Sequence, residues 1–142
     1  SRCRHRTGES SRRGGISDSN PEPTFGYFAE RLNAYGLAYL HVIEPRVMGT
    51  ETLIEGQAPV ASSFLRKIFS GPLMAAGGFD RDGAEDILQR GDADLVAFGR
   101  WFSSNPDLPE RFRHGHPLTQ YVRDAFWGGD ERAYIDFMPF AA

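Results

Sequence analysis

LAYLHVIEP (residues 37–45), LMAAGGF (residues 73–79) and ADLVAFGRWF (residues 93–102) are the stretches that decide the fold. Each is short, almost continuously apolar and bounded by proline, glycine or aspartate. Runs of this kind are typical of strands buried on both faces of a parallel sheet. Segments with helical apolar spacing lie between them, and this alternation predicts β-α-β crossovers in an α/β fold.

The intervening segments carry their apolar residues on one helical face. Helices are predicted over residues 24–35, 58–69 and 81–90 from this spacing. Beyond the last strand, helices are predicted over residues 106–112 and 117–127, because these segments start after prolines. In the helix over residues 24–35, an apolar stripe is formed by Phe25, Phe28, Leu32 and Tyr35, and Gly36 is the predicted stop.

The third helix has clear end signals, with Asp80 as N-cap and Gly91 as terminator. Its inward residues are predicted to be Ala84, Ile87 and Leu88. We expect residues 46–57 to form a loop and the aromatic tail 134–140 to pack across the body.

Composition places the chain among ordinary soluble domains. It has 142 residues, 40% of them apolar and 25% charged, with a net charge of −3. No stretch approaches the ~18 apolar residues of a membrane span, so we expect no membrane partner. One cysteine, Cys3, excludes a disulfide framework and favours a reducing cytoplasm. The length also excludes a complete eight-stranded β/α barrel, which needs at least about 200 residues.

Positive charge is concentrated at the start of the chain. Residues 1–15 contain five arginines and one glutamate, whereas the rest is acidic. Such an arm can bind nucleic acid, but it has no aromatic residue and no periodicity, so a disordered tail is favoured. An acidic body would repel phosphate backbones, so we expect no nucleic-acid partner. The chain starts at Ser1 without a signal-peptide core, which we interpret as a fragment or as a processed or mispredicted start.

Glycines end two of the three predicted strands. Gly77 and Gly78 follow one strand, and Gly99 with Arg100 ends the next. Ligands of parallel sheets bind at the carboxyl ends of strands, where glycine lets backbone amides approach an anion. Arginine adds a fork of donors that fits phosphate. The residues therefore predict a phosphate clamp, with tight strand-to-helix turns as the alternative.

Weaker candidates are scattered along the chain. His41 lies in a predicted strand and is interpreted as a hydrogen-bonded core residue, with a catalytic base as the alternative. Glu44 and Arg46 could touch a ligand or form an ion pair. His114 and His116 lack a third ligand at metal spacing, so no metal site is predicted.

Four stretches together carry a family resemblance, and they run from about Ile16 to about Phe137. They are SDSNPEPTFGYFAERLNAYGLAYLHVIEPRV, GPLMAAGGFDRDGAEDIL, DLVAFGRWFSSNPDLPERF and HPLTQYVRDAFWGGDERAYIDF. This combination resembles the C-terminal portion of the Old Yellow Enzyme family of FMN-dependent NAD(P)H dehydrogenases and ene-reductases. The resemblance implies a partial (β/α)8 TIM barrel comprising strands six to eight, formed by residues 16–142, with residues 1–15 as a tail foreign to the family.

The resemblance also implies a cofactor site. Gly77 and Gly78 would offer amides to the FMN phosphate, and Ala97, Gly99 and Arg100 would complete that site. Phe126 would pack near the flavin ring. Trp127 would lie on the rim of the substrate pocket, which in this family takes an α,β-unsaturated carbonyl compound after NAD(P)H has reduced the flavin.

The chain lacks motifs that belong to earlier parts of the family's sequence. These are an R-[LI]-S-P strand, a His/Asn or His/His pair that holds the substrate carbonyl, and a tyrosine acid. We therefore expect no catalytic residue in this chain and no ene-reductase activity from it alone. The alternative functions are a non-enzymatic remnant or binding module that retains weak FMN or phosphate binding and, more remotely, a small flavodoxin-like domain.

Overall fold

A computed structural model of the chain describes residues 18–48, 52–53, 58–126, 130–132 and 135–141. The predicted tail 1–15, including Cys3, lies outside these residues, as does Trp127. The chain forms two compact units, Ser1–Ala97 and Phe98–Ala142. In the described ranges, no helix has the length and apolar character needed to cross a membrane.

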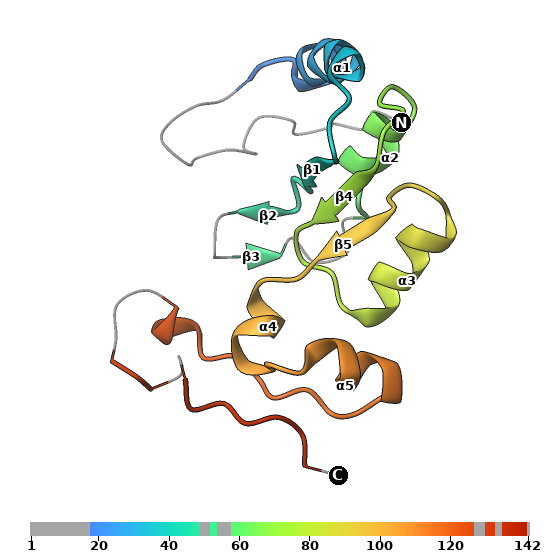
Figure 1. Cartoon of the computed structure of the whole chain (residues 1–142). Helices are drawn as coiled ribbons and strands as arrows, with labels where there is room; N and C mark the ends of the chain where they lie inside the picture. The colour runs from blue at the N-terminus through green and yellow to red at the C-terminus, as the bar shows by residue number, and fades with distance from the viewer. Residues whose placement is uncertain (1–17, 49–51, 54–57, 127–129, 133–134, 142) are drawn as a thin grey trace, which may run out of the picture. The chain divides into compact units, whose positions relative to one another are not determined.

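Three parallel strands form the sheet of the first unit. They are β1 (Leu40–Ile43), β4 (Leu73–Ala76) and β5 (Leu95–Ala97), in the order β1-β4-β5 (Figure 1). Ala75 lies opposite Val42 on one side and Val96 on the other. The predicted strands are confirmed as parallel neighbours, although each is shorter than predicted because its glycine or proline end leaves the ladder.

A helix follows each of the first two sheet strands. The helices of this unit are α1 (Pro21–Leu32), η1 (Asn33–Tyr35), α2 (Ala61–Arg66) and α3 (Arg81–Gln89). Figure 1 shows α2 and α3 to the right of the sheet. The connections β1-α2-β4 and β4-α3-β5 are the predicted crossovers. The segment predicted as a loop also contains a short antiparallel pair, β2 (Val47–Met48) and β3 (Thr52–Leu53).

The core lies on the face of the sheet that the helices cover. Its buried apolar residues include Val42, Leu65, Phe69, Leu73, Ala75, Ala84 and Ile87. The opposite face is open, since His41, Ile43 and Leu95 are exposed. The prediction of a strand buried on both faces is therefore wrong for β1, and His41 is not a core histidine. Alternate residues of a strand point to opposite faces, and only one face is covered here.

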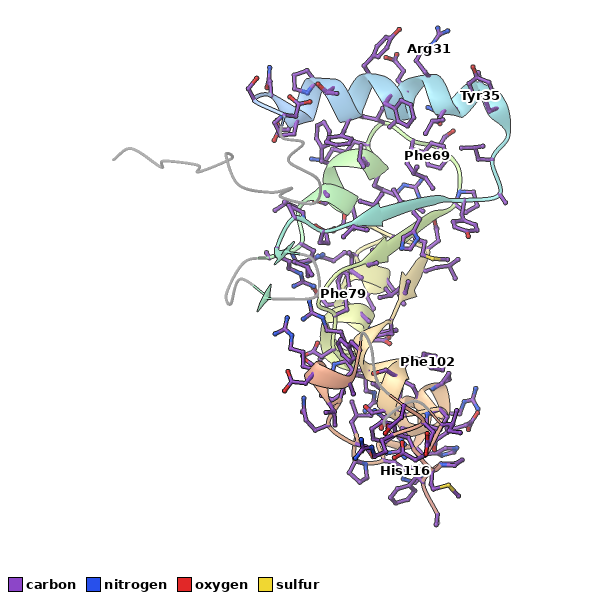
Figure 2. The ribbon with its side chains drawn as sticks, turned by 90° about the vertical axis from the view of Figure 1, so that its left-hand side faces the viewer. Arg31, Tyr35, Phe69, Phe79, Phe102 and His116 are labelled. Atoms are coloured by element: carbon purple, nitrogen blue, oxygen red, sulfur yellow. The ribbon has the colours of Figure 1, made fainter. Side chains whose placement is uncertain are left out.

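Helix α1 packs through small residues. Gly26 and Ala29 are buried, and a Cβ added at Gly26 would lie 3.2 Å from Ile68 Cδ1 and 3.3 Å from Phe64 Cζ. Figure 2 shows Phe69 beneath this helix. The predicted helix is confirmed, but its large apolar stripe is not the buried face.

The second unit is built on α4 (Arg100–Ser104), α5 (Leu108–His114) and the short η2 (Arg123–Ala125). Asn105 is buried and donates through Nδ2 to the carbonyls of Trp101 (2.8 Å) and Thr119 (2.9 Å), and its Oδ1 accepts from the Thr119 amide at 2.8 Å. These bonds hold the segment after α5 extended, so the prediction of a helix over 117–127 is wrong except at η2.

The buried guanidinium of Arg111 organises the rest of this unit. Its Nε donates to Asp107 Oδ1 at 2.8 Å, and its other nitrogens bind the carbonyls of Pro117 and Met138 at 2.9 and 3.1 Å. The Phe140 amide donates to Asp107 Oδ2 at 2.8 Å. The described part of the aromatic tail therefore packs on α5, within its own unit.

Candidate functional site

The carboxyl ends of β4 and β5 lie side by side. Their last paired residues are Ala76 and Ala97, and Gly77 and Gly78 come directly after β4. The structure thus brings Gly77, Gly78 and Ala97 to one edge of the sheet, as predicted from their positions after parallel strands. Gly99, Arg100 and Phe126 belong to the second unit and are described there.

The backbone itself requires glycine at residue 77. Its φ is 111°, and an added Cβ would lie 3.2 Å from the Glu44 amide nitrogen. Gly78 also has a positive φ, at 70°. A tight strand-to-helix turn, the alternative to a phosphate clamp, is therefore enough to explain why residue 77 is glycine. A side chain there would be both strained and crowded.

Arg46 holds this turn from the end of β1. Its Nε donates to the Gly77 carbonyl at 3.0 Å, and its guanidinium carbon lies 4.4 Å from the centre of the Phe79 ring. Burial lowers the pKa of the Arg46 guanidinium, and the carboxylates of Glu44 and Asp80 oppose that shift. Arg46 therefore fixes the direction of the peptide that follows β4, a role that the sequence did not reveal.

Glu44 has a structural task that the sequence also did not reveal. Its buried carboxylate accepts hydrogen bonds from the amides of Val60 (2.7 Å), Ala61 (2.9 Å) and Ser62 (2.9 Å), and from the Ser62 hydroxyl. These are the free donors at the start of α2. The sequence allowed Glu44 and Arg46 either a ligand contact or an ion pair. In the described part of the chain no ion pair joins them, and the Glu44 carboxylate caps α2. The sequence signal that could have found it is a glutamate directly after a buried strand.

In the second unit, Gly99 and Arg100 begin α4. Gly99 has φ −102°, and an added Cβ would meet no atom within 4 Å, so neither backbone strain nor a neighbouring atom requires glycine here. The Arg100 side chain ends in a buried Nη2 that has no hydrogen-bond partner among the described residues. A buried guanidinium nitrogen without an acceptor is costly, so this nitrogen needs an acceptor that the described residues do not supply.

Aromatic contacts connect Phe126 to the residue after Arg100. The Phe126 ring lies 5.6 Å from Tyr121, and Tyr121 meets Trp101 edge-on at 5.1 Å, both measured between ring centres. Phe126 is half-buried. The second unit therefore gathers Trp101, Tyr121 and Phe126 into one cluster of flat rings.

The two loop histidines have partners of their own. His114 Nε2 lies 3.4 Å from Glu110 Oε2, and His116 stacks on Phe140 with ring centres 4.2 Å apart. Across the described ranges, no group of three or more His, Cys, Asp or Glu residues is arranged to hold a metal ion. These contacts account for His114 through a neighbouring carboxylate and for His116 through aromatic stacking.

Residues 26–119 match the family described as NADH:flavin oxidoreductase / NADH oxidase. The chain belongs to this family. The match includes both glycine-bearing strand ends, together with Arg100. It ends before Phe126.

Curated relatives of this flavin oxidoreductase family agree. The chain is 42% identical over 116 residues to 12-oxophytodienoate reductase 2 of Arabidopsis thaliana, covering 80% of this chain and 30% of that protein. It is 42% identical over 127 residues to 12-oxophytodienoate reductase 1 of rice, covering 87% and 32%. The chain thus spans about a third of the length of the curated relatives it matches.

Solved structures of the family share the fold. Morphinone reductase in complex with tetrahydroNAD matches with a TM-score of 0.75 at 40% identity, over 89% of this chain and 32% of that one. The old yellow enzyme from Trypanosoma cruzi matches with a TM-score of 0.78 at 28% identity, over the same shares. The parallel sheet and its helices therefore correspond to part of the barrel found in these flavin oxidoreductases.

Proposed function

We propose that this chain is the C-terminal, FMN-phosphate-binding part of an Old Yellow Enzyme-type oxidoreductase, comprising barrel strands six to eight. Family membership supports this proposal, as does similarity to 12-oxophytodienoate and morphinone reductases. The substrate class is a small α,β-unsaturated carbonyl compound, with NAD(P)H as reductant, and the compartment is the cytoplasm. When bound, FMN supplies the hydride-transfer chemistry between nicotinamide and alkene.

The unpartnered Nη2 of Arg100 is the observation that carries the proposal. A phosphate oxygen is the acceptor that a buried guanidinium nitrogen fits best, because the pair is charge-assisted. Gly99 leaves open space beside it in the chain, as a closely approaching ligand needs. In β/α barrels generally, the loops after the seventh and eighth strands frequently bind phosphate.

The backbone supplies the remaining donors in this proposal. The amides of Gly77 and Gly78 bind the phosphate, and Ala97 and Gly99 line the same anion. Arg46 holds the Gly77 peptide in place through its bond to the Gly77 carbonyl. This assignment rests on the hydrogen-bond donors of these residues and on the open space beside Gly99.

Two aromatic residues complete the proposed pocket. Phe126 packs beside the flavin ring, which suits its place among the rings of Trp101 and Tyr121. Trp127 forms the rim of the substrate pocket. No residue of this chain is assigned a catalytic role, so the chain alone is expected to show no NADPH-dependent turnover of cyclohexenone.

A binding module without enzyme activity is the second candidate. It is favoured by the arginine-rich start of the chain, residues 1–15, which lies outside the family match at residues 26–119. Such a module would bind FMN through the same residues. Binding without turnover fits both candidates, whereas turnover by the 142-residue chain would exclude the second.

Substitution of Arg100 tests the phosphate site. Arg100→Ala should weaken FMN binding at least about tenfold, the usual scale for losing a charge-assisted contact. Flavin fluorescence during titration with the chain measures the affinity. Arg90→Ala is the control, because Arg90, at the end of α3, forms surface ion pairs with Asp86 and Asp92. An affinity for FMN that is the same with and without the Arg100 side chain would remove the assignment.

A further inference from the structure

Arg46 contacts the glycine turn after β4 at two points. Its Nε donates to the Gly77 carbonyl at 3.0 Å, and its guanidinium carbon lies 4.4 Å from the centre of the Phe79 ring. Phe79 is buried, so the guanidinium packs against a side chain that is itself held in the core. Arg46 therefore contacts the residues on both sides of Gly78.

The backbone brings Arg46 to this position. Strands β1 and β4 are parallel neighbours whose last paired residues are Ile43 and Ala76, so the residues that follow the two strands lie side by side. The Val47 amide donates to the Glu44 carbonyl at 3.3 Å, which closes a turn around residue 46. The Arg46 side chain thus starts next to the peptide that it contacts.

A single peptide unit carries the Gly77 carbonyl and the Gly78 amide. In a trans peptide these two groups point in opposite directions, so a bond that fixes the carbonyl also fixes the direction of the amide. Among the described residues, no acceptor is found for the Gly78 amide. Glycine is conformationally permissive, and both residues have positive φ, so the bond from Arg46 selects one backbone conformation of this turn.

We propose that Arg46 is a positioning residue of the phosphate site: its hydrogen bond to the Gly77 carbonyl directs the Gly78 amide toward the phosphate and gives the site its preference for FMN over riboflavin. This inference rests on the proposed function and deepens it. Arg46 acts through the backbone, as a hydrogen-bond donor, and is not itself a ligand of the phosphate.

The charges around Arg46 favour this indirect role. The carboxylates of Glu44 and Asp80 both interact electrostatically with its guanidinium. Two negative groups beside one cation offset its attraction for an incoming anion. The position of the Nε donor, and not the charge, is therefore what the turn uses.

Two substitutions separate the hydrogen bond from the charge. Arg46→Gln removes the charge but keeps an N–H donor, because glutamine Nε2 is as many bonds from Cα as arginine Nε. Arg46→Met removes both the charge and the donor. Arg46→Met should weaken FMN binding about tenfold, since the Gly78 amide is no longer held, whereas Arg46→Gln should retain most of the affinity. Neither variant should change the response to riboflavin, which has no phosphate.

Fluorescence titration with FMN and with riboflavin measures these affinities, and urea denaturation shows that each variant is folded during the titration. In NMR spectra, FMN should shift the Gly78 amide signal of the unsubstituted chain and of Arg46→Gln, but not that of Arg46→Met. A purely structural role for Arg46 would change stability without changing this response. Arg81→Met is the control, because Arg81 is an exposed cation at the start of α3, and it should leave FMN affinity unchanged.

The possible failures are distinguishable. Equal loss of FMN affinity in Arg46→Gln and Arg46→Met would show that the charge matters, and would overturn the positioning role. Unchanged affinity in Arg46→Met would overturn it as well, while leaving the proposed function intact. If Arg46→Met does not fold, the Arg46→Gln result decides: a tenfold loss overturns the role, and a retained Gly78 shift supports it. An unsubstituted chain that responds equally to FMN and riboflavin would remove the proposed function and this inference together.

Discussion

Two glycines that look equivalent in the sequence differ in whether the structure requires glycine at their positions. Gly77 is required by a φ of 111° and by close contact with the Glu44 backbone, whereas Gly99 has neither constraint. Sequence reasoning treated the two as one clamp. It predicted their position after strands from hydrophobic patterning alone, but the distinction between them depends on backbone angles and neighbours, which patterning does not contain.

The Gly77→Ala substitution tests this distinction. It should reduce the free energy of unfolding by about 2–4 kcal/mol, because positive φ and a Cβ crowded against the Glu44 backbone both oppose alanine. Gly91→Ala is the control, with φ 74° and nothing within 4 Å of the added Cβ, and it should cost about 1 kcal/mol. Urea denaturation measures both values. Equal losses would mean that the Glu44 contact has no role.

At the level of elements, the sequence was most informative where local chemistry defines both ends. Asp80 caps α3 by accepting from the Gly83 amide at 2.8 Å, and Gly91 ends it with φ 74°, as predicted. Leu88 was predicted inward but is exposed. Helical spacing identifies a stripe without identifying its partner, and for α1 the stripe remains uncovered.

The segment 117–127 is where prediction from the sequence failed. Its start at a proline favoured a helix, but Asn105 and Arg111 bind the backbone of Pro117 and Thr119 and the side chain of Thr119. These contacts join residues 6 to 14 positions apart, beyond one helical turn, so local propensity could not predict them. The S-S-N-P-D-L-P-E-R-F motif of the resemblance is thus largely structural in this chain.

The attachment of the C-terminal segment to α5 should weaken at acidic pH, when the Asp107 carboxylate becomes protonated. The hydrogen bond from the Phe140 amide, followed by that from Arg111, lowers the pKa of Asp107 from its ordinary value of 3.8. A carboxyl with a lowered folded-state pKa stabilises the fold above pH 3.8, and this contribution is lost as the pH falls through the lower, folded-state pKa.

NMR measures this dependence at the Phe140 amide proton. Its signal should titrate with a midpoint below 3.8, and Asp107→Asn should abolish the titration. A midpoint at or above the ordinary value would show that Asp107 does not hold the segment in solution.

At the scale of the whole molecule, the length of the chain has to be compared with that of its solved relatives. A chain of 142 residues suffices for an ordinary domain, yet among the described residues its three-stranded sheet has one face and both edges without cover. Solved relatives that share this fold are about three times longer. The α/β class and parallel order were predictable from alternating apolar runs, whereas the exposure of one sheet face could not be predicted, because apolar runs do not show which face is covered.

A comparison of FMN with riboflavin tests the central claim most directly, because the two ligands differ only by the phosphate. The account predicts that FMN raises the melting temperature of the chain and that riboflavin at the same concentration does not. Equal stabilisation by both ligands, or stabilisation by neither, would contradict a phosphate-binding site formed by Gly77, Gly78, Ala97, Gly99 and Arg100.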